Sequence, residues 1–350
     1  MTPAPKPQRE YVAEIRPLLP ASTFIPRPQK LWWMLAHSMI LVAGVFIIRT
    51  TPYAWSVPLV SLIMAHSIGC FGCIIHDVSH NSVVTWRPLK YLLELYVWSL
   101  VLGSAYLWHR VHNQAHHRMP NSLRDPHRRY TKGEANWAVR LFDRVFMRSR
   151  TTPWVNLTFL AFFADIVRNL IAPLLYGGSR KPAITTYKPH YTGKERLRIQ
   201  AEFALAVAVH IGIFYAAGAT WAHYLWAGLL PAIGGSAVMT AYAVLNHLPA
   251  PLMREPVDPL VTTISLRVPR VFDWLHQHIS HHTEHHLFPN MSSTHYPLVR
   301  AILQERYPDR FQCITYREAV RRLRECQPFP EVLPAAQVSG TAGATMQSGA

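Results

Sequence analysis

The chain has 350 residues, enough for one large domain, and half of them are apolar while only 15% are charged. Its formal net charge is +16, but the basic residues lie between hydrophobic stretches that approach membrane-spanning length. This pattern favours loops at an anionic membrane surface and argues against a nucleic-acid-binding module.

Residues 1–30 are rich in Pro and lack the apolar core and small-residue cleavage site of a signal peptide, so we expect a cytosolic segment. Aromatic residues such as Trp32, Trp55 and Trp221 lie near the ends of the long apolar stretches, as expected at a membrane interface. These stretches predict four transmembrane helices, in two hairpins, at residues 31–48, 53–75, 202–217 and 221–245.

Two further apolar stretches contain charged residues. Residues 91–107 include Glu94, and residues 153–176 include Asp165 and Arg168. A charge at the centre of a bilayer costs roughly 2.5–3.5 kcal/mol on insertion scales. We therefore predict that both stretches form helices lying in the membrane interface.

Two smaller features complete the domain plan. Cys70-Phe-Gly-Cys73 matches a redox spacing, although cysteines inside an apolar helix also serve simply as packing residues. Residues 328–350 consist mainly of Ala, Gly, Ser and Pro and predict a disordered tail. The membrane domain is accordingly expected to cover residues 31–327.

Three histidine motifs carry the chemistry of this chain. Imidazole is polar, needs a partner when buried and is the commonest metal-binding side chain. Eight such residues in three short segments therefore indicate a metal site. The motifs are His76-Asp-Val-Ser-His80, His112-Asn-Gln-Ala-His116-His117 and His282-Thr-Glu-His285-His286.

The spacing within the motifs predicts two metal ions. Histidines four apart share one face of an α-helix. Adjacent histidines, such as His116 with His117 and His285 with His286, point about 100° apart around a helix and suit two neighbouring ions. Eight donors also exceed the four that one tetrahedral zinc ion takes.

Further residues are candidates near this centre. His247 lies at the end of the fourth predicted span and is either a ninth ligand or a capping residue. Asp77, Asn246 and Glu284 are candidate hydrogen-bond partners of the ligands. Imidazole suits iron, copper, zinc and nickel, so spacing alone does not choose the metal.

The motifs can meet only if an even number of spans separates each pair, and the predicted spans satisfy this condition. Of the 35 Lys and Arg residues, all but Arg49 then fall on the side of the motifs. The positive-inside rule makes that side cytoplasmic, with both termini there, and in a bacterium the membrane would be the inner one. We expect an all-α integral membrane protein, with four spans and a cytosolic helical cap holding a di-metal site.

The order HxxxH, HxxxHH and HxxHH, with spans between, resembles the membrane fatty acid desaturase superfamily. The segment ending His285-His286-Leu-Phe-Pro289 is similar to acyl-chain desaturases, and the resemblance covers about residues 31–297. His282 stands where front-end members usually have Gln, and no His-Pro-Gly-Gly motif of a fused cytochrome b5 domain is present.

This resemblance implies an oxidoreductase with two iron ions that uses O2 to place a double bond in an acyl chain attached to a lipid, coenzyme A or acyl carrier protein. Electrons would come from a separate ferredoxin or cytochrome b5. The substrate would enter a channel under the cap, and flanking aromatic residues could line it, with simple packing as the alternative. They are Trp86, Tyr106, Trp108 and Trp274.

Other functions also fit parts of this sequence. Relatives on the same scaffold hydroxylate fatty acids, or hydroxylate and ketolate carotenoids. A membrane metal transporter would instead place its donors at the membrane midplane, whereas these motifs lie at span ends and in polar segments. His281-His-Thr-Glu-His285 also matches a zinc-protease signature, which leaves the other two motifs unexplained.

Overall fold

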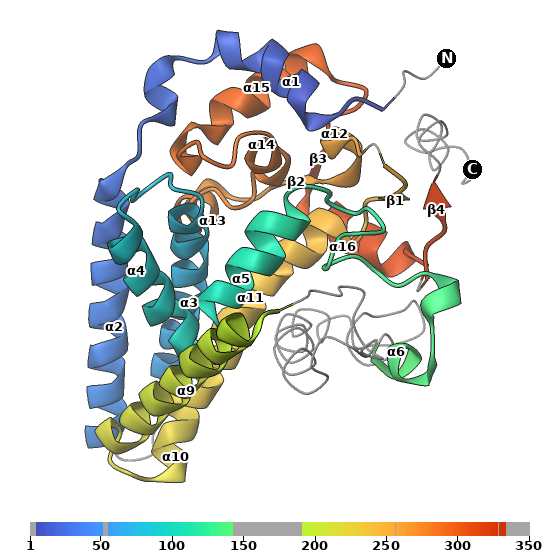
Figure 1. Ribbon diagram of the computed structural model, residues 1–350. Helices are drawn as coiled ribbons and strands as arrows, with labels where there is room; N and C mark the ends of the chain where they lie inside the picture. The colour runs from blue at the N-terminus through green and yellow to red at the C-terminus, as the bar shows by residue number, and fades with distance from the viewer. Residues whose placement is uncertain (1–4, 52–54, 143–190, 256, 328, 334–350) are drawn as a thin grey trace.

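The computed structural model describes residues 5–51, 55–142, 191–255, 257–327 and 329–333. Figure 1 shows long helices extending from a layer of shorter helices and small strands. The α-helices of the described part are α1 (Gln8–Ile15), α2 (Leu31–Thr50), α3 (Ser56–Ser79), α4 (Arg87–Leu100), α5 (Ala105–Trp108), α6 (Trp137–Phe142), α9 (Gly193–Ala216), α10 (Trp221–Tyr224), α11 (Leu230–His247), α12 (Pro259–Thr262), α13 (Arg270–Leu275), α14 (His282–Leu287), α15 (Tyr296–Arg306) and α16 (Tyr316–Glu325).

Two small parallel sheets lie among the shorter helices. β1 (Leu252–Met253) pairs with β4 (Val332–Leu333), and β2 (Ser265–Arg267) pairs with β3 (Cys313–Thr315). The expected fold was entirely helical, so these strands are a correction. Strands of two or three residues are too short to show the alternation of side chains that reveals a strand in a sequence.

The described part holds four helices that are long and apolar enough to cross a membrane. They are Pro28–Thr50, Ser56–Ser79, Gly193–Ala216 and Trp221–His247. Each overlaps one of the four predicted spans. The third helix begins nine residues before its predicted span, at residue 193 rather than 202, because a polar first turn opens it. There the side chains of Thr192 and Glu195 form a capping box.

The predicted interfacial helix at residues 91–107 is not one straight helix. It is divided between α4 and the following segment Ala105–His116, which is bent by 105° relative to α4. The bend contains Leu102 at a positive φ of 54°, an uncommon conformation for a residue other than Gly. Length and composition also allow this pair to be one broken span. The other predicted interfacial helix, residues 153–176, lies outside the described residues.

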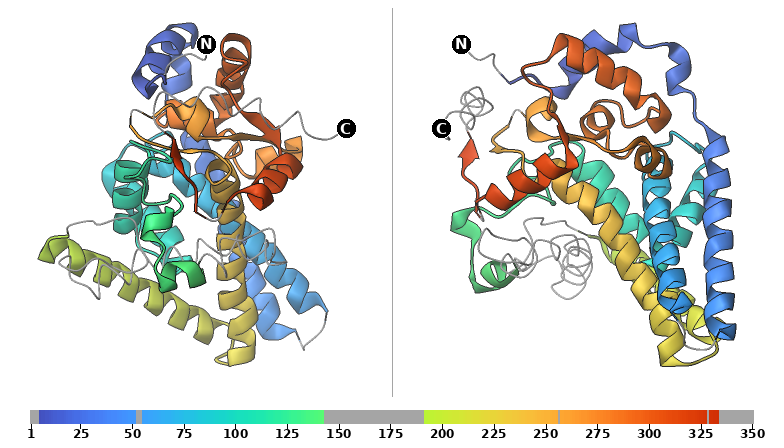
Figure 2. Two further views of the ribbon diagram at one scale, coloured as in Figure 1. Left: turned by 90° about the vertical axis from the view of Figure 1, so that its right-hand side faces the viewer. Right: turned by 180° about the vertical axis from the view of Figure 1, so that it is seen from behind.

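Close packing between α3 and α11 sets the position of two site-bearing helix ends. Figures 1 and 2 show the two helices side by side. A Cβ atom added at Gly235 would lie 2.4 Å from Cγ2 of Ile68, and one added at Gly72 would lie 2.4 Å from Cγ of Met239. Small residues thus let the backbones approach closely, as in membrane helix pairs.

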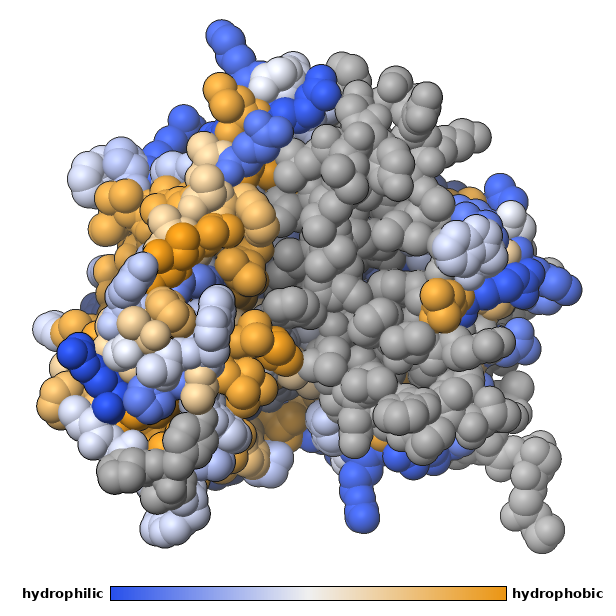
Figure 3. Space-filling model, turned by 90° about the horizontal axis from the view of Figure 1, so that it is seen from below, coloured by the Kyte–Doolittle hydropathy of each residue, from blue (hydrophilic) through white to orange (hydrophobic). Residues whose placement is uncertain are grey.

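The long helices expose apolar side chains that a water-soluble protein would bury. Trp55 and Trp221 are 81% and 76% exposed, and Val42 is 72% exposed. Figure 3 shows hydrophobic side chains gathered over the described helices at this end of the molecule. Lipid contact accounts for such a surface, since exposed apolar patches of soluble proteins are small.

The N-terminal segment packs onto the layer that carries the third histidine motif. Tyr11 and Ile15 of α1 are fully buried and join a core with Leu287, Tyr296 and Val299 of the later helices. The predicted disordered tail begins at residue 328. Within it, Val332–Leu333 forms strand β4, and residues 334–350 lie outside the described residues.

Candidate metal centre

The first histidine motif closes helix α3. His76 lies in its last turn, and His80 directly follows its final residue, Ser79. Both imidazoles are buried. Their four-residue separation brings the rings within 5.1 Å of each other, measured between centroids. The C-terminal end of α3 therefore places two imidazole donors beside one possible metal position.

The second motif lies on a π-helix, His109–His116, rather than on the α-helix assumed from its sequence. Hydrogen bonds in a π-helix join residues five apart. The amide of His117 accordingly donates to the carbonyl of His112 at 3.1 Å. His112 and His117 therefore face one side, while His116 faces another. The wider turn decides which of these histidines act together.

The third motif forms α14, and buried polar bonds fix this short helix. Glu284, which is fully buried, accepts hydrogen bonds from Ser265 and from Nε of Arg300 at 2.7 Å. Burial would raise the pKa of Glu284, but Arg300 and His281 lower it to about 2. The resulting carboxylate anchors α14 while His282, His285 and His286 are presented together.

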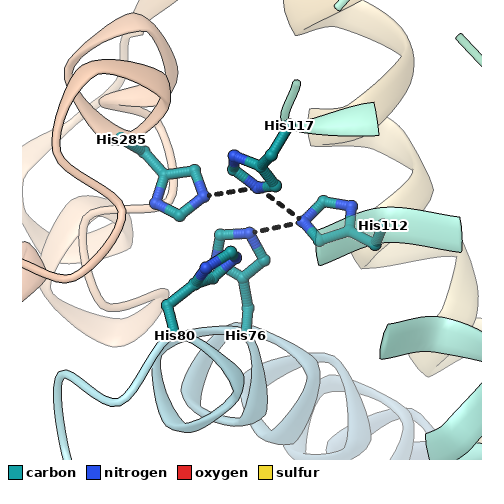
Figure 4. A group of neighbouring side chains, drawn as sticks. All are labelled: His76, His80, His112, His117 and His285. Carbon is teal, nitrogen blue, oxygen red and sulfur yellow. Dashed lines mark hydrogen bonds between the residues drawn. The ribbon is translucent and has the colours of Figure 1, made fainter. Parts of the chain in front are cut away.

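Nine histidines converge in two groups, each with its donor nitrogens within 4.8 Å of one another. In the first group, shown in Figure 4, Nε2 of His112 lies 3.1 Å from Nε2 of both His76 and His117. Nε2 of His285 lies 3.1 Å from Nε2 of His117. The members are His76, His80, His112, His117 and His285.

The second group includes His247, the last residue of α11. Its Nε2 atom lies 3.1 Å from Nε2 of His116 and contacts Nε2 of His282. Nε2 of His286 lies 3.2 Å from Nε2 of His282. The members are His116, His247, His282 and His286. His247 thus lies among the other candidate ligands rather than at a separate helix cap.

Each pair of adjacent histidines is divided between the two groups. His117 and His285 belong to the first group, while His116 and His286 belong to the second. The groups are neighbours, because the rings of His117 and His286 stack with centroids 4.6 Å apart. This division into two neighbouring groups is compatible with a di-metal site.

The donor set fits metal ions better than it fits hydrogen bonding alone. Burial lowers the pKa of His282, His285 and His286 well below the usual range, so these rings are neutral. A neutral imidazole carries one hydrogen, and wherever two facing Nε2 atoms both lack it, as when each ring is protonated at Nδ1, their lone pairs repel. Cations bound between these nitrogens would remove that repulsion, and nitrogen-only sites suit first-row transition metals.

Two side chains that the sequence reasoning missed orient these ligands. Oδ1 of Asp125 lies 2.9 Å from Nδ1 of His116, and the hydroxyl of Tyr296 lies 2.8 Å from Nδ1 of His285. A partner at Nδ1 leaves Nε2 to bind the metal. Burial opposes ionisation of Asp125, but His116 holds the pKa of its carboxyl below the usual range. Neither residue lies in a recognisable motif.

The three residues predicted to hydrogen-bond the ligands, Asp77, Asn246 and Glu284, have other surroundings. Asp77 accepts hydrogen bonds from Lys30 and Ser293, and Glu284 bonds Ser265, Arg300 and His281. The Asn246 amide is buried without a hydrogen-bond partner among the described residues. None of these side-chain hydrogen bonds is made with one of the nine clustered histidines.

His281, which adjoins the third motif, is turned toward carboxylates. Its Nε2 lies 3.2 Å from Oδ2 of Asp273, and its Nδ1 lies 3.2 Å from Oε1 of Glu284. Burial lowers its pKa, but these two hydrogen bonds raise it above the ordinary value. His281 is thus an ion-pairing residue here and not a member of either histidine group.

The four candidate channel residues separate into different surroundings. Trp108 stacks on His112 with centroids 4.1 Å apart, whereas Tyr106 donates its hydroxyl to Glu195. Trp86 and Trp274 are exposed, and Trp274 packs edge-on against Trp33. Trp274 lines a cavity of about 370 Å³ together with Trp33. Trp108 lines a separate apolar cavity of about 30 Å³ between α3, α4 and α11. Its other walls are Ile68, Gly72, Ile75, Val97, Trp98, Val101, Gly235, Ser236 and Met239.

Comparison with known proteins agrees with the histidine pattern. A family model described as "Fatty acid desaturase" matches residues 53–318, a range that contains all nine clustered histidines. An acyl-lipid (8-3)-desaturase from Physcomitrium patens is 22% identical over 314 residues. That match covers 78% of this chain and 60% of the relative, so the chain spans less than two thirds of the length of that protein.

Proposed function

Because the chain belongs to the fatty acid desaturase family, we propose that it is a membrane di-iron acyl desaturase that uses O2 to introduce a double bond into an acyl chain. The observation that carries this proposal is the convergence of nine buried histidines in two adjacent groups. An apolar cavity lies next to the first histidine group. The indole of Trp108 separates the two, because it stacks on His112 and also lines the cavity.

We infer that five imidazoles hold one iron ion and four hold the other. When bound, the two ions would supply O2-dependent oxidation of an unactivated methylene. The chain's own residues keep the donors neutral by burial and orient them from outside. Asp125 and Tyr296 perform this second task for His116 and His285.

The cavity beside Trp108 is the proposed place for the reacting part of the acyl chain. Its walls are almost entirely apolar, which suits a hydrocarbon and disfavours water beside the reacting methylene. A volume of about 30 Å³ is roughly the share of one water molecule in the liquid, so the walls must move to admit a chain. Met239 is an adaptable wall residue because its side chain is unbranched.

We further propose that the four long helices form two transmembrane hairpins and that the remaining elements form a cytosolic cap. Counted on that arrangement, Arg49 is the one basic residue on the outer side, which supports cytoplasmic termini. An external donor such as ferredoxin or cytochrome b5 would then deliver two electrons to the cap side. The acyl carrier is a lipid, coenzyme A or acyl carrier protein.

The test is acyl-chain analysis in a host that supplies a ferredoxin system. Cells expressing the wild-type chain are compared with cells expressing His116→Ala, and whole-cell fatty acids are profiled by mass spectrometry. The proposal predicts a new acyl species about two mass units lighter in the wild-type sample alone. A species about sixteen units heavier would identify a hydroxylase instead. Unchanged profiles with several acyl carriers and both donor types would reject the proposal.

A further inference from the structure

A third group of donor side chains lies apart from the nine clustered histidines. His66 and Cys70 are one turn apart on α3, and His276 directly follows α13. Their donor atoms all lie within 4.8 Å of one another. His66 precedes His76 by ten residues on the same helix, which places it about 15 Å along the axis from the histidines already described.

Two of the spacings between these three donors are close to those around one tetrahedral ion. Nε2 of His66 lies 3.1 Å from Nε2 of His276, and Sγ of Cys70 lies 3.9 Å from Nε2 of His66. Zinc bonds to nitrogen and sulfur imply tetrahedral edges of about 3.3 Å between two nitrogens and about 3.6 Å between nitrogen and sulfur. These two separations differ from those edges by a few tenths of an ångström, and Sγ of Cys70 lies within 4.8 Å of the donor nitrogen of His276.

The third group also repeats the local geometry of the nine-histidine centre. The 3.1 Å separation of Nε2 atoms equals that between His76 and His112. The hydroxyl of Tyr242 lies 2.8 Å from Nδ1 of His276, as the hydroxyl of Tyr296 does from Nδ1 of His285. A partner at Nδ1 again leaves Nε2 of His276 directed at the other donors.

The surroundings leave room for a fourth ligand. Cys70 is fully buried, and His276 is 7% exposed. His276 and Tyr242 also line a largely apolar cavity of about 380 Å³, together with Val238, Ala241, Val268, Pro269, Phe272 and Tyr316. A water molecule or another small ligand could reach an ion from that side. Cys73, the other half of the predicted redox pair, instead directs its Sγ toward Sδ of Met239 at 3.5 Å.

We propose that His66, Cys70 and His276 form a separate mononuclear site for a borderline transition-metal ion of the Zn²⁺ type. Thiolate and imidazole donors together select such ions, whereas the neighbouring centre is built from imidazole alone. An ion at this site would fasten the end of α13 to the middle of α3. This site is independent of the proposed desaturation chemistry.

Cobalt substitution tests the site without relying on activity. The full-length protein, purified in detergent and stripped with a chelator, is titrated with Co²⁺. Only a site with a cysteine ligand produces a near-ultraviolet thiolate-to-cobalt absorption band, so the all-histidine centre does not contribute to it. We expect a band whose final amplitude corresponds to one thiolate-bound Co²⁺ per chain, whatever Co²⁺ the histidine groups also take up, and which is lost in Cys70→Ser. Added Zn²⁺ should displace the Co²⁺ and abolish the band.

Two variants separate this site from its surroundings. Cys73→Ser changes a neighbouring buried thiol and should keep the band, and His116→Ala disrupts the proposed di-iron centre and should also keep it. Size-exclusion profiles and iron content confirm that Cys70→Ser remains folded. The proposal is overturned if the wild-type protein gives no thiolate band, or if the band survives Cys70→Ser or disappears in Cys73→Ser.

Discussion

The carboxylate of Asp125 lies 2.9 Å from Nδ1 of His116 and thereby fixes which nitrogen of that imidazole faces the second histidine group. The backbone amides of Asn121 and His127 donate to the same carboxylate at 2.6 Å and 2.8 Å. The loop after the second motif is therefore built to hold this oxygen in place. Replacing Asp125 tests that role.

Asp125→Asn should lower metal affinity and product formation by roughly 10- to 100-fold, the usual effect of losing such an outer partner. The amide keeps the size of the side chain but removes the charge that favours a protonated Nδ1. Iron content and acyl products are measured in the same preparation. Asp309→Asn, at an exposed position, is the matched control and should behave as wild type. Full activity of Asp125→Asn would show that His116 needs no such partner.

Tyr296→Phe removes one hydroxyl next to His285. Tyr296 is buried, and burial raises its pKa well above the ordinary value, so the group remains a neutral phenol at physiological pH. We expect lower iron occupancy with little loss of folded protein, because the aromatic ring still fills its place. Tyr307→Phe, which loses a bond to Glu14 near the surface, serves as the control. Equal occupancy in both variants would contradict the assignment.

Gly235→Ala tests whether close packing of α3 and α11 positions the centre. The added Cβ would lie 2.4 Å from Cγ2 of Ile68 and 3.0 Å from the carbonyl oxygen of Ala65, so the helices must separate. Overpacking of this kind costs about 1–3 kcal/mol. We expect a lower thermal unfolding midpoint and weaker iron retention. Gly212→Ala is the control, because no atom lies within 4 Å of the new Cβ, and it should lower neither the unfolding midpoint nor the iron retention.

Ser236→Leu tests the proposed acyl position. Its hydroxyl is buried with no hydrogen-bond partner among the described residues, at the wall of the cavity beside Trp108. The larger apolar side chain should block the cavity, so acyl products should fall much further than iron content, which changes only as far as the side chain also strains the contact of α3 with α11. Ser236→Ala keeps the cavity open and should retain activity. Normal product levels in Ser236→Leu would place the acyl chain elsewhere.

Many of the clustered residues could be predicted because the candidate metal ligands lie close together in the sequence, in short motifs of one residue type. Residue type and close spacing single out the imidazoles of three motifs and the histidine at the end of a predicted span. The α-helical spacing, however, put His112 and His116 on one face, whereas the structure groups His112 with His117. The observed groups contain those nine histidines. The family comparison likewise agrees with the resemblance drawn from the motifs.

The remaining features depend on tertiary contacts that one sequence does not display. Asp125 and Tyr296 meet their histidines through loop and helix packing, so neither has a motif of its own. The π-helix extends over the eight residues His109–His116, and hydrophobic periodicity does not reveal its wider turns. Asp77 and Glu284 were expected to support ligands because they lie within the motifs, yet their side chains point to Lys30 and Arg300.

Iron stoichiometry in a preparation of demonstrated activity tests the central claim most directly. The protein is purified after acyl products have been detected, and iron is counted per chain in the wild type and in His247→Ala, with the exposed-loop variant Asp309→Asn as control. We predict two iron ions per active wild-type chain and a loss of iron and product in His247→Ala. Full activity with one iron ion or none would contradict a centre built from both histidine groups.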